Sequence, residues 1–120
     1  MNHIELGRYG EDLATDYLKD QGYDVLERNI RYRFGEVDII AKKENMLIVV
    51  EVKTRRTHTY GMPCEAVHWK KKQHIRHVIS MFLATRDIEY ESIRFDVIEV
   101  YVPVPQVGGY ELRHMKACHL

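Results

Sequence analysis

Residues 35–56 read GEVDIIAKKENMLIVVEVKTRR, and this stretch decides the fold. Two apolar runs, 36–42 and 47–55, flank a polar turn at Glu44 and Asn45. The pattern predicts two strands joined as an antiparallel hairpin. Such strongly apolar strands are typical of the centre of a sheet, where both faces are covered. Charged residues nevertheless interrupt both runs, and charges in buried strands require a physical reason.

The turn determines which of these charges face each other. Strand residues two apart share a face, so Glu36 lies with Asp38, and Glu51 with Lys53. A two-residue loop, or a four-residue loop centred on the same turn, places Asp38 opposite Glu51. The same register sets Glu36 opposite Lys53. A three-residue loop would instead put the two carboxylates on opposite faces, so the interpretation depends on this register.

Two carboxylates opposed in buried strands repel each other and need a neutralising partner. A hard divalent cation, Mg²⁺ or Mn²⁺, bound through oxygen atoms, would supply one. Lys53, on the same face, could then orient an attacking water or stabilise charge that develops on a phosphate. The ordinary alternative is an E-x-K surface pair, but the apolar surroundings and the acid on the partner strand favour a metal site.

The rest of the chain supplies the layers around this hairpin. Periodicity predicts a helix over 4–21 that stops at Gly22, strands over 23–30 and 92–102, a helix over 64–85 and a short edge strand over 110–116. The order indicates an α/β fold in a single domain over 1–120, with a mixed sheet and at least one crossover helix.

Net charge excludes little, because 18 basic residues balance 18 acidic ones in the 120-residue chain. The middle of the chain is locally basic, which is compatible with a polyanion such as nucleic acid, although a run of charge is more often a solvated face. The candidate backbone contacts are Arg55, Arg56, Lys70, Lys71 and Lys72. Serine-hydrolase, P-loop and dinucleotide-binding glycine motifs are absent from the sequence, which excludes those classes.

The sequence also indicates where the protein works. No apolar run approaches the roughly 18 residues of a membrane span, so no membrane partner is expected. Cys64 and Cys118 lack framework spacing and are interpreted as free thiols in a reducing compartment, which predicts a cytoplasmic location. The C-terminal His114, Cys118 and His119 match no zinc pattern and are interpreted as incidental.

Three further groups stand near apolar faces. Glu11 lies at the border of the apolar arc of the first predicted helix, and Lys71 continues the apolar stripe of the second. Either could be solvated or point at the end of the sheet. Arg94 and Asp96 share a strand face and are expected to join a buried salt-bridge network with neighbouring residues, of structural rather than functional character.

Asp38 and the run Glu51-Val52-Lys53 resemble the PD-(D/E)xK nuclease signature, with Val37 before the aspartate in place of proline. Six blocks in order, GRYGEDLATDYL, GYDVLERNIR, FGEVDIIA, VVEVKTRR, YGMPCEAV and RFDVIEV, resemble the YraN-type uncharacterised family of small bacterial proteins. That family is similar to archaeal Holliday-junction resolvases. The resemblance covers about residues 5–102 and leaves 103–120 as a C-terminal extension.

The resemblance implies a restriction-endonuclease-like fold, in which helices flank a mixed central β-sheet. Glu11 matches a resolvase glutamate that joins the aspartate, glutamate and lysine of the site. Lys71 matches a lysine that recurs in the YraN-type pattern, and Glu36 matches its G-E-x-D and is a candidate site neighbour. Because resolvases act as dimers, a homodimer is also implied.

These inferences lead to one expectation: a metal-dependent endonuclease that hydrolyses branched or single-stranded DNA in repair or recombination. Asp38, Glu51 and the Val52 carbonyl, with Glu11, would hold Mg²⁺ or Mn²⁺, and Lys53 would orient the attacking water. A catalytically silent nucleic-acid-binding module with the same fold is the alternative. A protein-interaction scaffold, its acids satisfied by Arg94 or Lys71, is a third possibility.

Overall fold

Five strands and two helices make up the part of the chain that the computed structural model describes, residues 1–57 and 67–120. In chain order they are α1 (His3–Asp20), β1 (Asp24–Tyr32), β2 (Gly35–Lys43), β3 (Met46–Arg55), α2 (Trp69–Thr85), β4 (Ser92–Tyr101) and β5 (Glu111–Met115). The predicted α/β order and the short edge strand are confirmed.

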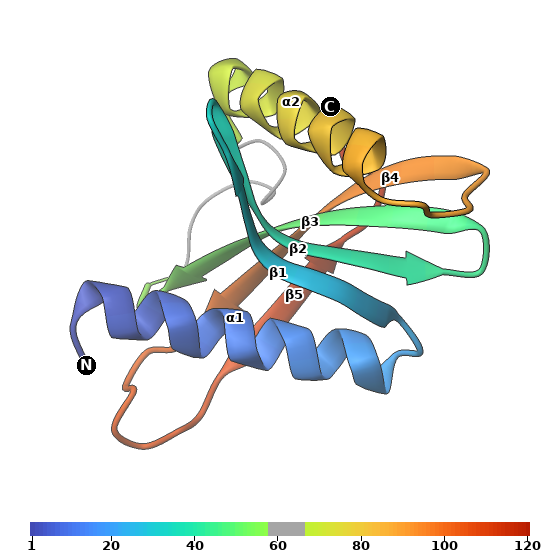
Figure 1. Ribbon diagram of the computed structural model, residues 1–120. Coiled ribbons are helices and arrows are strands. Elements are labelled where there is room, and N and C mark those ends of the chain that lie inside the picture. The colour runs from blue at the N-terminus through green and yellow to red at the C-terminus, as the bar shows by residue number, and fades with distance from the viewer. Residues whose placement is uncertain (58–66) are drawn as a thin grey trace.

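The strands form one mixed sheet in the order β1-β2-β3-β4-β5. Only β3 and β4 pair in parallel, and α2 lies between them in the chain as the crossover helix. Figure 1 shows α1 along one face of the sheet and α2 across the other. The predicted mixed sheet flanked by helices is therefore confirmed, and it is compatible with a restriction-endonuclease-like fold.

The central strands are buried on both faces. Between α2 and the sheet lies a core that includes Ile40, Leu47, Val49, Ile75, Val78 and Phe82. Between α1 and the sheet lies a second core that includes Leu6, Ala14, Leu18, Ile39, Ile48 and Val50. Alternate residues of β2 and β3 therefore serve opposite cores, which explains why their apolar runs are continuous.

Both helices begin and end at recognisable signals. Asn2 caps α1 through its side chain, which accepts a hydrogen bond from Glu5 N at 2.8 Å. Gly22, at φ +88°, ends α1 as predicted, in a Schellman arrangement with Tyr23 N donating to Leu18 O. The helix predicted from residue 64 begins only at Trp69, because His68 caps it through its side chain. Residues 64–66 lie outside the described chain.

Two glycines allow backbone and side chains to approach closely. A Cβ on Gly10 would lie 1.8 Å from Thr54 Oγ1, so α1 can rest against β3 only without a side chain there. A Cβ on Gly35 would lie 2.7 Å from His74 O, so the β1–β2 turn is equally tight against α2. These two glycines therefore allow α1 to approach β3, and α2 to approach the β1–β2 turn.

The C-terminal extension is integrated into the fold. Cys118 N donates to Phe95 O at 2.7 Å, and the Cys118 and Leu120 side chains pack against the core beneath α2. Cys118 is disulfide-bonded, so its prediction as a free thiol is wrong, whereas Cys64 lies outside the described residues. A disulfide-bonded cysteine gives no support for a reducing compartment. No helix in the described ranges is long and apolar enough to cross a membrane.

Candidate functional site

The site begins where β2 and β3 separate. Their pairs run from Lys43↔Met46 to Ile39↔Val50, which confirms the two-residue turn and its register. Beyond the last pair, Asp38 Oδ2 accepts a hydrogen bond from Val52 N at 2.7 Å, and the charge of Asp38 acts on Glu51, so the two carboxylates lie close together although the ladder no longer pairs them. The expected pairing of Glu36 with Lys53 is not part of this ladder, which ends at Ile39 and Val50. Glu36 instead accepts hydrogen bonds from Arg31 on β1, at 2.9 and 3.2 Å.

Glu51 is the most constrained acid of this site. It is only 8% exposed, and its Oε2 has no hydrogen-bond partner among the described residues. Burial, and then the charge of Asp38, raises the pKa of Glu51 to about 7. Burial also raises the pKa of Asp38, although the hydrogen bond from Val52 N opposes the rise. The structure thus holds two carboxylates together with too little compensating charge.

Lys71 supplies part of that compensation. Its Nζ lies 3.3 Å from Glu51 Oε1, across the gap between α2 and β3. Burial alone would lower the pKa of Lys71, but the charge of Glu51, followed by those of Asp38 and Glu36, outweighs it and raises the pKa. Arg94, the other cation considered from sequence, pairs with Asp96 instead. Lys71 is therefore a neighbour of the carboxylate pair.

Lys53 completes the E-x-K run on β3. It is half-buried, two residues beyond Glu51 and on the same face of the strand. Burial lowers the pKa of Lys53, and the attraction of Glu51 offsets only part of that effect. A lysine with a lowered pKa gives up its proton more readily near neutral pH than an exposed lysine does, which suits it to proton transfer.

Glu11 reaches the same site from α1. It lines a cavity of about 470 Å³ together with Asn29, Glu36 and Asp38. Burial and the charge of Asp38 raise the pKa of Glu11, and its Oε1 has no hydrogen-bond partner in the described ranges. The nearest cation, Arg28 Nη2, is 4.0 Å from that oxygen. The structure therefore places Glu11 in one cavity with Asp38, whereas Glu51 does not line that cavity.

The donor atoms suit a hard divalent cation. No three His, Cys, Asp or Glu side chains within residues 1–57 and 67–120 are grouped closely enough to hold a metal by themselves. Asp38 and Glu51 could supply two side-chain oxygens to a cation, and Glu51 Oε2 is a buried oxygen without a hydrogen-bond partner among the described residues. The N–H and C=O of one strand residue leave on the same side, so the Val52 carbonyl also faces β2. Oxygen donors completed by water are what Mg²⁺ and Mn²⁺ take.

The remaining predicted phosphate contacts occupy two places. Arg55 lies 3.7 Å from Glu99 Oε2, and Arg56 Nη2 donates to Met1 O at 2.6 Å, so both stand beside the start of α1. Lys70 is exposed and Lys72 half-buried in the first turn of α2. Of the five, the structure brings Lys71 directly to the carboxylates.

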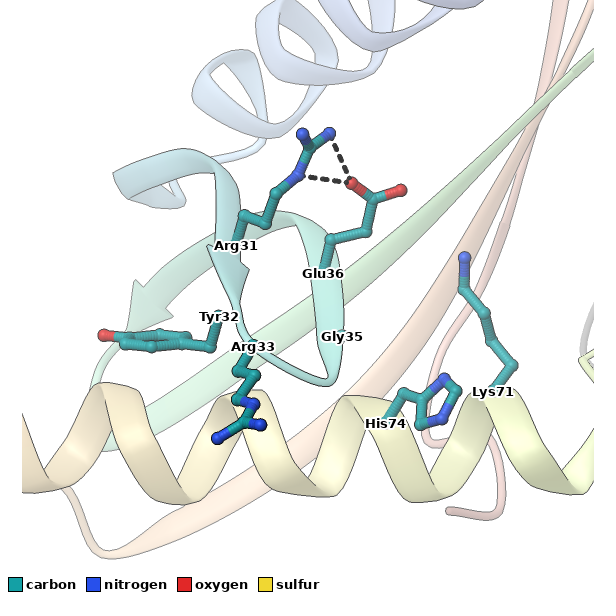
Figure 2. Close-up of a pocket in the computed structure, with 7 residues that line it drawn as sticks. All are labelled: Arg31, Tyr32, Arg33, Gly35, Glu36, Lys71 and His74. Carbon is teal, nitrogen blue, oxygen red and sulfur yellow. Dashed lines mark hydrogen bonds and ion pairs between the residues drawn. The ribbon is translucent and has the colours of Figure 1, made fainter.

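Several residues of the site were not assigned from sequence. Arg31, Arg33 and His74 line a second cavity, of about 320 Å³, together with Glu36 and Lys71 (Figure 2). The basic R-x-R-F-G stretch before β2 was visible, but nothing local shows that α2 packs against it. Asn29 adopts φ 51°, a left-handed conformation that asparagine tolerates better than most residues.

A separate polar network lies under α1 and β5. Arg94 donates to both Asp96 oxygens at 2.8 and 2.9 Å, so the predicted buried salt bridge is confirmed. His114 Nε2 lies 2.7 Å from Asp96 Oδ2, and its Nδ1 lies 2.8 Å from Tyr17 OH. His114 therefore has a structural contact that the sequence did not indicate, because β5 brings it beside β4.

Comparison with known proteins gives a consistent result. The model of the uncharacterised protein family UPF0102 matches residues 10–100. A UPF0102 protein of Dictyoglomus turgidum is 42% identical over 92% of this chain and 95% of its own. Others, from Caldicellulosiruptor saccharolyticus and Clostridioides difficile, are each 46% identical, over 87% and 85% of this chain and 88% and 90% of their own.

Proposed function

The chain belongs to the uncharacterised protein family UPF0102, whose description names no activity, and from its site we propose a metal-dependent phosphodiesterase that hydrolyses DNA. One observation carries the proposal: where β2 and β3 separate, the buried Glu51 and the half-buried Asp38 lie together and short of compensating charge. Burying such a pair destabilises a fold, so a function that needs negative charge at this point explains its presence.

The residues divide the chemistry among them. Asp38, Glu51 and the Val52 carbonyl would hold Mg²⁺ or Mn²⁺, with Glu11 beside them across the cavity it shares with Asp38. When bound, such a cation supplies positive charge to the phosphate and makes water a stronger nucleophile. Val52 N–H orients Asp38, and Lys71 holds the Glu51 side chain at 3.3 Å.

Lys53 is proposed to act on the water. Hydrolysis forms one bond from the water oxygen to phosphorus and breaks one P–O bond, and the water proton must leave. Lys53, half-buried beside Glu51 with a lowered pKa, can orient that water and stabilise charge on the phosphate. Because Lys53 lies next to the proposed metal ligands, it would be close to a water activated there, and catalysis requires such proximity.

DNA is the proposed substrate, because basic side chains adjoin the acids. Lys71 contacts Glu51, and Arg55 and Arg56 line a cavity of about 340 Å³ where β3 ends. Structure-selective cleavage in repair or recombination, a second copy of the chain as partner, and a cytoplasmic location where DNA lies all belong to this proposal. Phosphate contacts of this kind predict binding that weakens steeply with salt.

The ion pair between Lys71 and Glu51 favours a second candidate function. Because Lys71 already offsets part of the acidic charge, the domain could bind nucleic acid without hydrolysing it. That module would shift DNA in a salt-dependent way, yet would leave it intact with either cation. The two functions differ in turnover alone.

A cleavage panel tests the proposal. Labelled duplex, single-stranded, flap and four-way-junction DNAs are incubated with Mg²⁺ or Mn²⁺ and wild type, Glu51→Gln or the control Glu27→Gln. Glu27 is a surface acid paired with Arg86, so its variant makes the same charge change elsewhere. Cleavage by wild type and the control that is lost in Glu51→Gln supports the proposal. Binding without cleavage under both metals overturns it in favour of the silent module.

A further inference from the structure

The cavity drawn in Figure 2 adjoins the carboxylate pair and has a composition of its own. Arg31, Arg33, Gly35 and Glu36 reach it from the β1–β2 turn, and Lys71 and His74 project into it from α2. Lys71 lines this cavity and also contacts the carboxylate pair, because its Nζ lies 3.3 Å from Glu51 Oε1. Whatever occupies this cavity therefore lies directly beside the proposed hydrolytic centre.

Its charge balance favours an anion. The single carboxylate, Glu36, is already held by two hydrogen bonds from Arg31, so this pair contributes little net charge. Arg33 has no carboxylate partner among the described residues, and His74 stands exposed beside it. With a volume of about 320 Å³, the cavity leaves Arg33 free to receive a group such as a phosphodiester.

An exposed aromatic ring adjoins this cavity through Arg33, although it is not one of the residues that line it. Phe34, between two of the lining residues, is 57% exposed, which is unusual for phenylalanine. It is nevertheless held in place, because the Arg33 guanidinium lies 5.0 Å from its ring and the His77 ring lies 5.7 Å away. Gly35, tight against His74, fixes the turn that carries it.

We propose that this cavity and Phe34 bind one unpaired nucleotide of single-stranded DNA, with its phosphate at Arg33 and its base stacked on the Phe34 ring. The inference rests on the proposed function and gives its substrate class. In a duplex the base faces are covered by neighbouring bases, so an exposed ring beside a phosphate site can be used only by an unstacked base. The geometry therefore selects single strands or strand junctions over continuous duplex.

Binding without hydrolysis tests this selection directly. Fluorescence anisotropy in EDTA compares a labelled single-stranded oligonucleotide with a duplex of equal length. Phe34→Ala should weaken single-strand binding about fivefold or more and leave duplex binding unchanged, whereas Phe34→Trp should retain it. Tyr110→Ala is the control, because Tyr110 is an exposed aromatic residue, at 49%, outside this cavity.

The phosphate contact is tested by salt dependence. Arg33→Ala should reduce the slope of log affinity against log salt by about 0.7 for single strands. Arg76→Ala, which removes the same charge from the exposed side of α2, should leave that slope unchanged. If Phe34→Ala and Arg33→Ala weaken single strand and duplex equally, or no more than their controls do, the inference is overturned.

The two proposals fail separately. Single-strand preference that depends on Phe34 in a protein that cleaves no DNA supports this inference and overturns the proposed hydrolysis. Cleavage that depends on Glu51 but not on Phe34 supports the hydrolysis and overturns the unpaired-nucleotide site.

Discussion

The carboxylate of Asp38 takes the place of a main-chain partner for β3, because its Oδ2 accepts the hydrogen bond of Val52 N at 2.7 Å. The contact lies just beyond the last β2–β3 pair, Ile39↔Val50. It holds Asp38 close to Glu51, whose Oε2 has no hydrogen-bond partner among the described residues. Asp38 and Glu51 thus lie together where two central strands separate, and this arrangement is the basis of the proposed metal site.

Lys53 should affect turnover more than metal binding. Its side chain is not among the proposed ligands, and its lowered pKa suits it to act on the water. Lys53→Met should therefore reduce the rate of DNA cleavage by about 100-fold or more. Mn²⁺ affinity should not fall, and titration calorimetry measures it. A loss of Mn²⁺ binding in this variant would assign Lys53 a structural role instead.

Gly10 should be the glycine of α1 that cannot be replaced. A side chain there would collide with Thr54, so Gly10→Ala should destabilise the protein by about 1–3 kcal/mol. Gly7 has no neighbouring atom within 4 Å, so Gly7→Ala should stabilise it by about 0.5–1 kcal/mol through helix propensity. Urea unfolding measures the free energy of unfolding of both variants. A similar change in that free energy at the two positions would contradict the close packing of α1 on β3.

The Asp96 network should matter far more to stability than the Glu36 pair. Asp96 is fully buried, and hydrogen bonds from His114 and Arg94 outweigh its burial and lower its pKa. Asp96→Asn should cost about 3–5 kcal/mol, because it leaves Arg94 uncompensated. Glu36→Gln breaks the exposed pair with Arg31 and should cost less than about 1 kcal/mol. Equal losses of unfolding free energy in the two variants would contradict the larger stabilising role of the Asp96 network.

The metal-free protein should lose stability as pH rises. The pKa of Glu51 is raised from 4.5 to about 7, so its favourable contribution is complete below pH 4.5 and is lost as pH rises through about 7. The corresponding penalty is on the order of 3 kcal/mol. In EDTA, urea unfolding should show a larger fall between pH 5 and pH 8 for wild type than for Glu51→Gln. Identical falls would mean that Glu51 is ionised without penalty.

The sequence was informative where a local rule determined the structure. Glu44 and Asn45 specify a two-residue turn, and with side chains alternating along each strand that turn alone placed Asp38 against Glu51. Gly22 likewise predicted the end of the first helix, because its left-handed conformation suits glycine. The carboxylate pair was therefore predictable without any tertiary information.

Contacts between distant segments were not predictable in the same way. The partnership of Lys71 with Glu51 depends on how α2 crosses the sheet, and the stripe on that helix allowed a solvated lysine equally well. The contact of His114 with Asp96 was not foreseen, because only the pairing of β5 with β4 brings the two together. The Arg33 cavity was missed for the same reason, since Lys71 and His74 of its lining come from α2.

The most direct measurement is the binding of Mn²⁺ to the protein in the presence of single-stranded DNA. Titration calorimetry should show binding by wild type and by the control Glu27→Gln, and affinity at least about tenfold lower in Asp38→Asn and Glu51→Gln. Absence of binding by wild type, or equal affinity in all four proteins, would contradict the claim that the Asp38–Glu51 pair is a metal site.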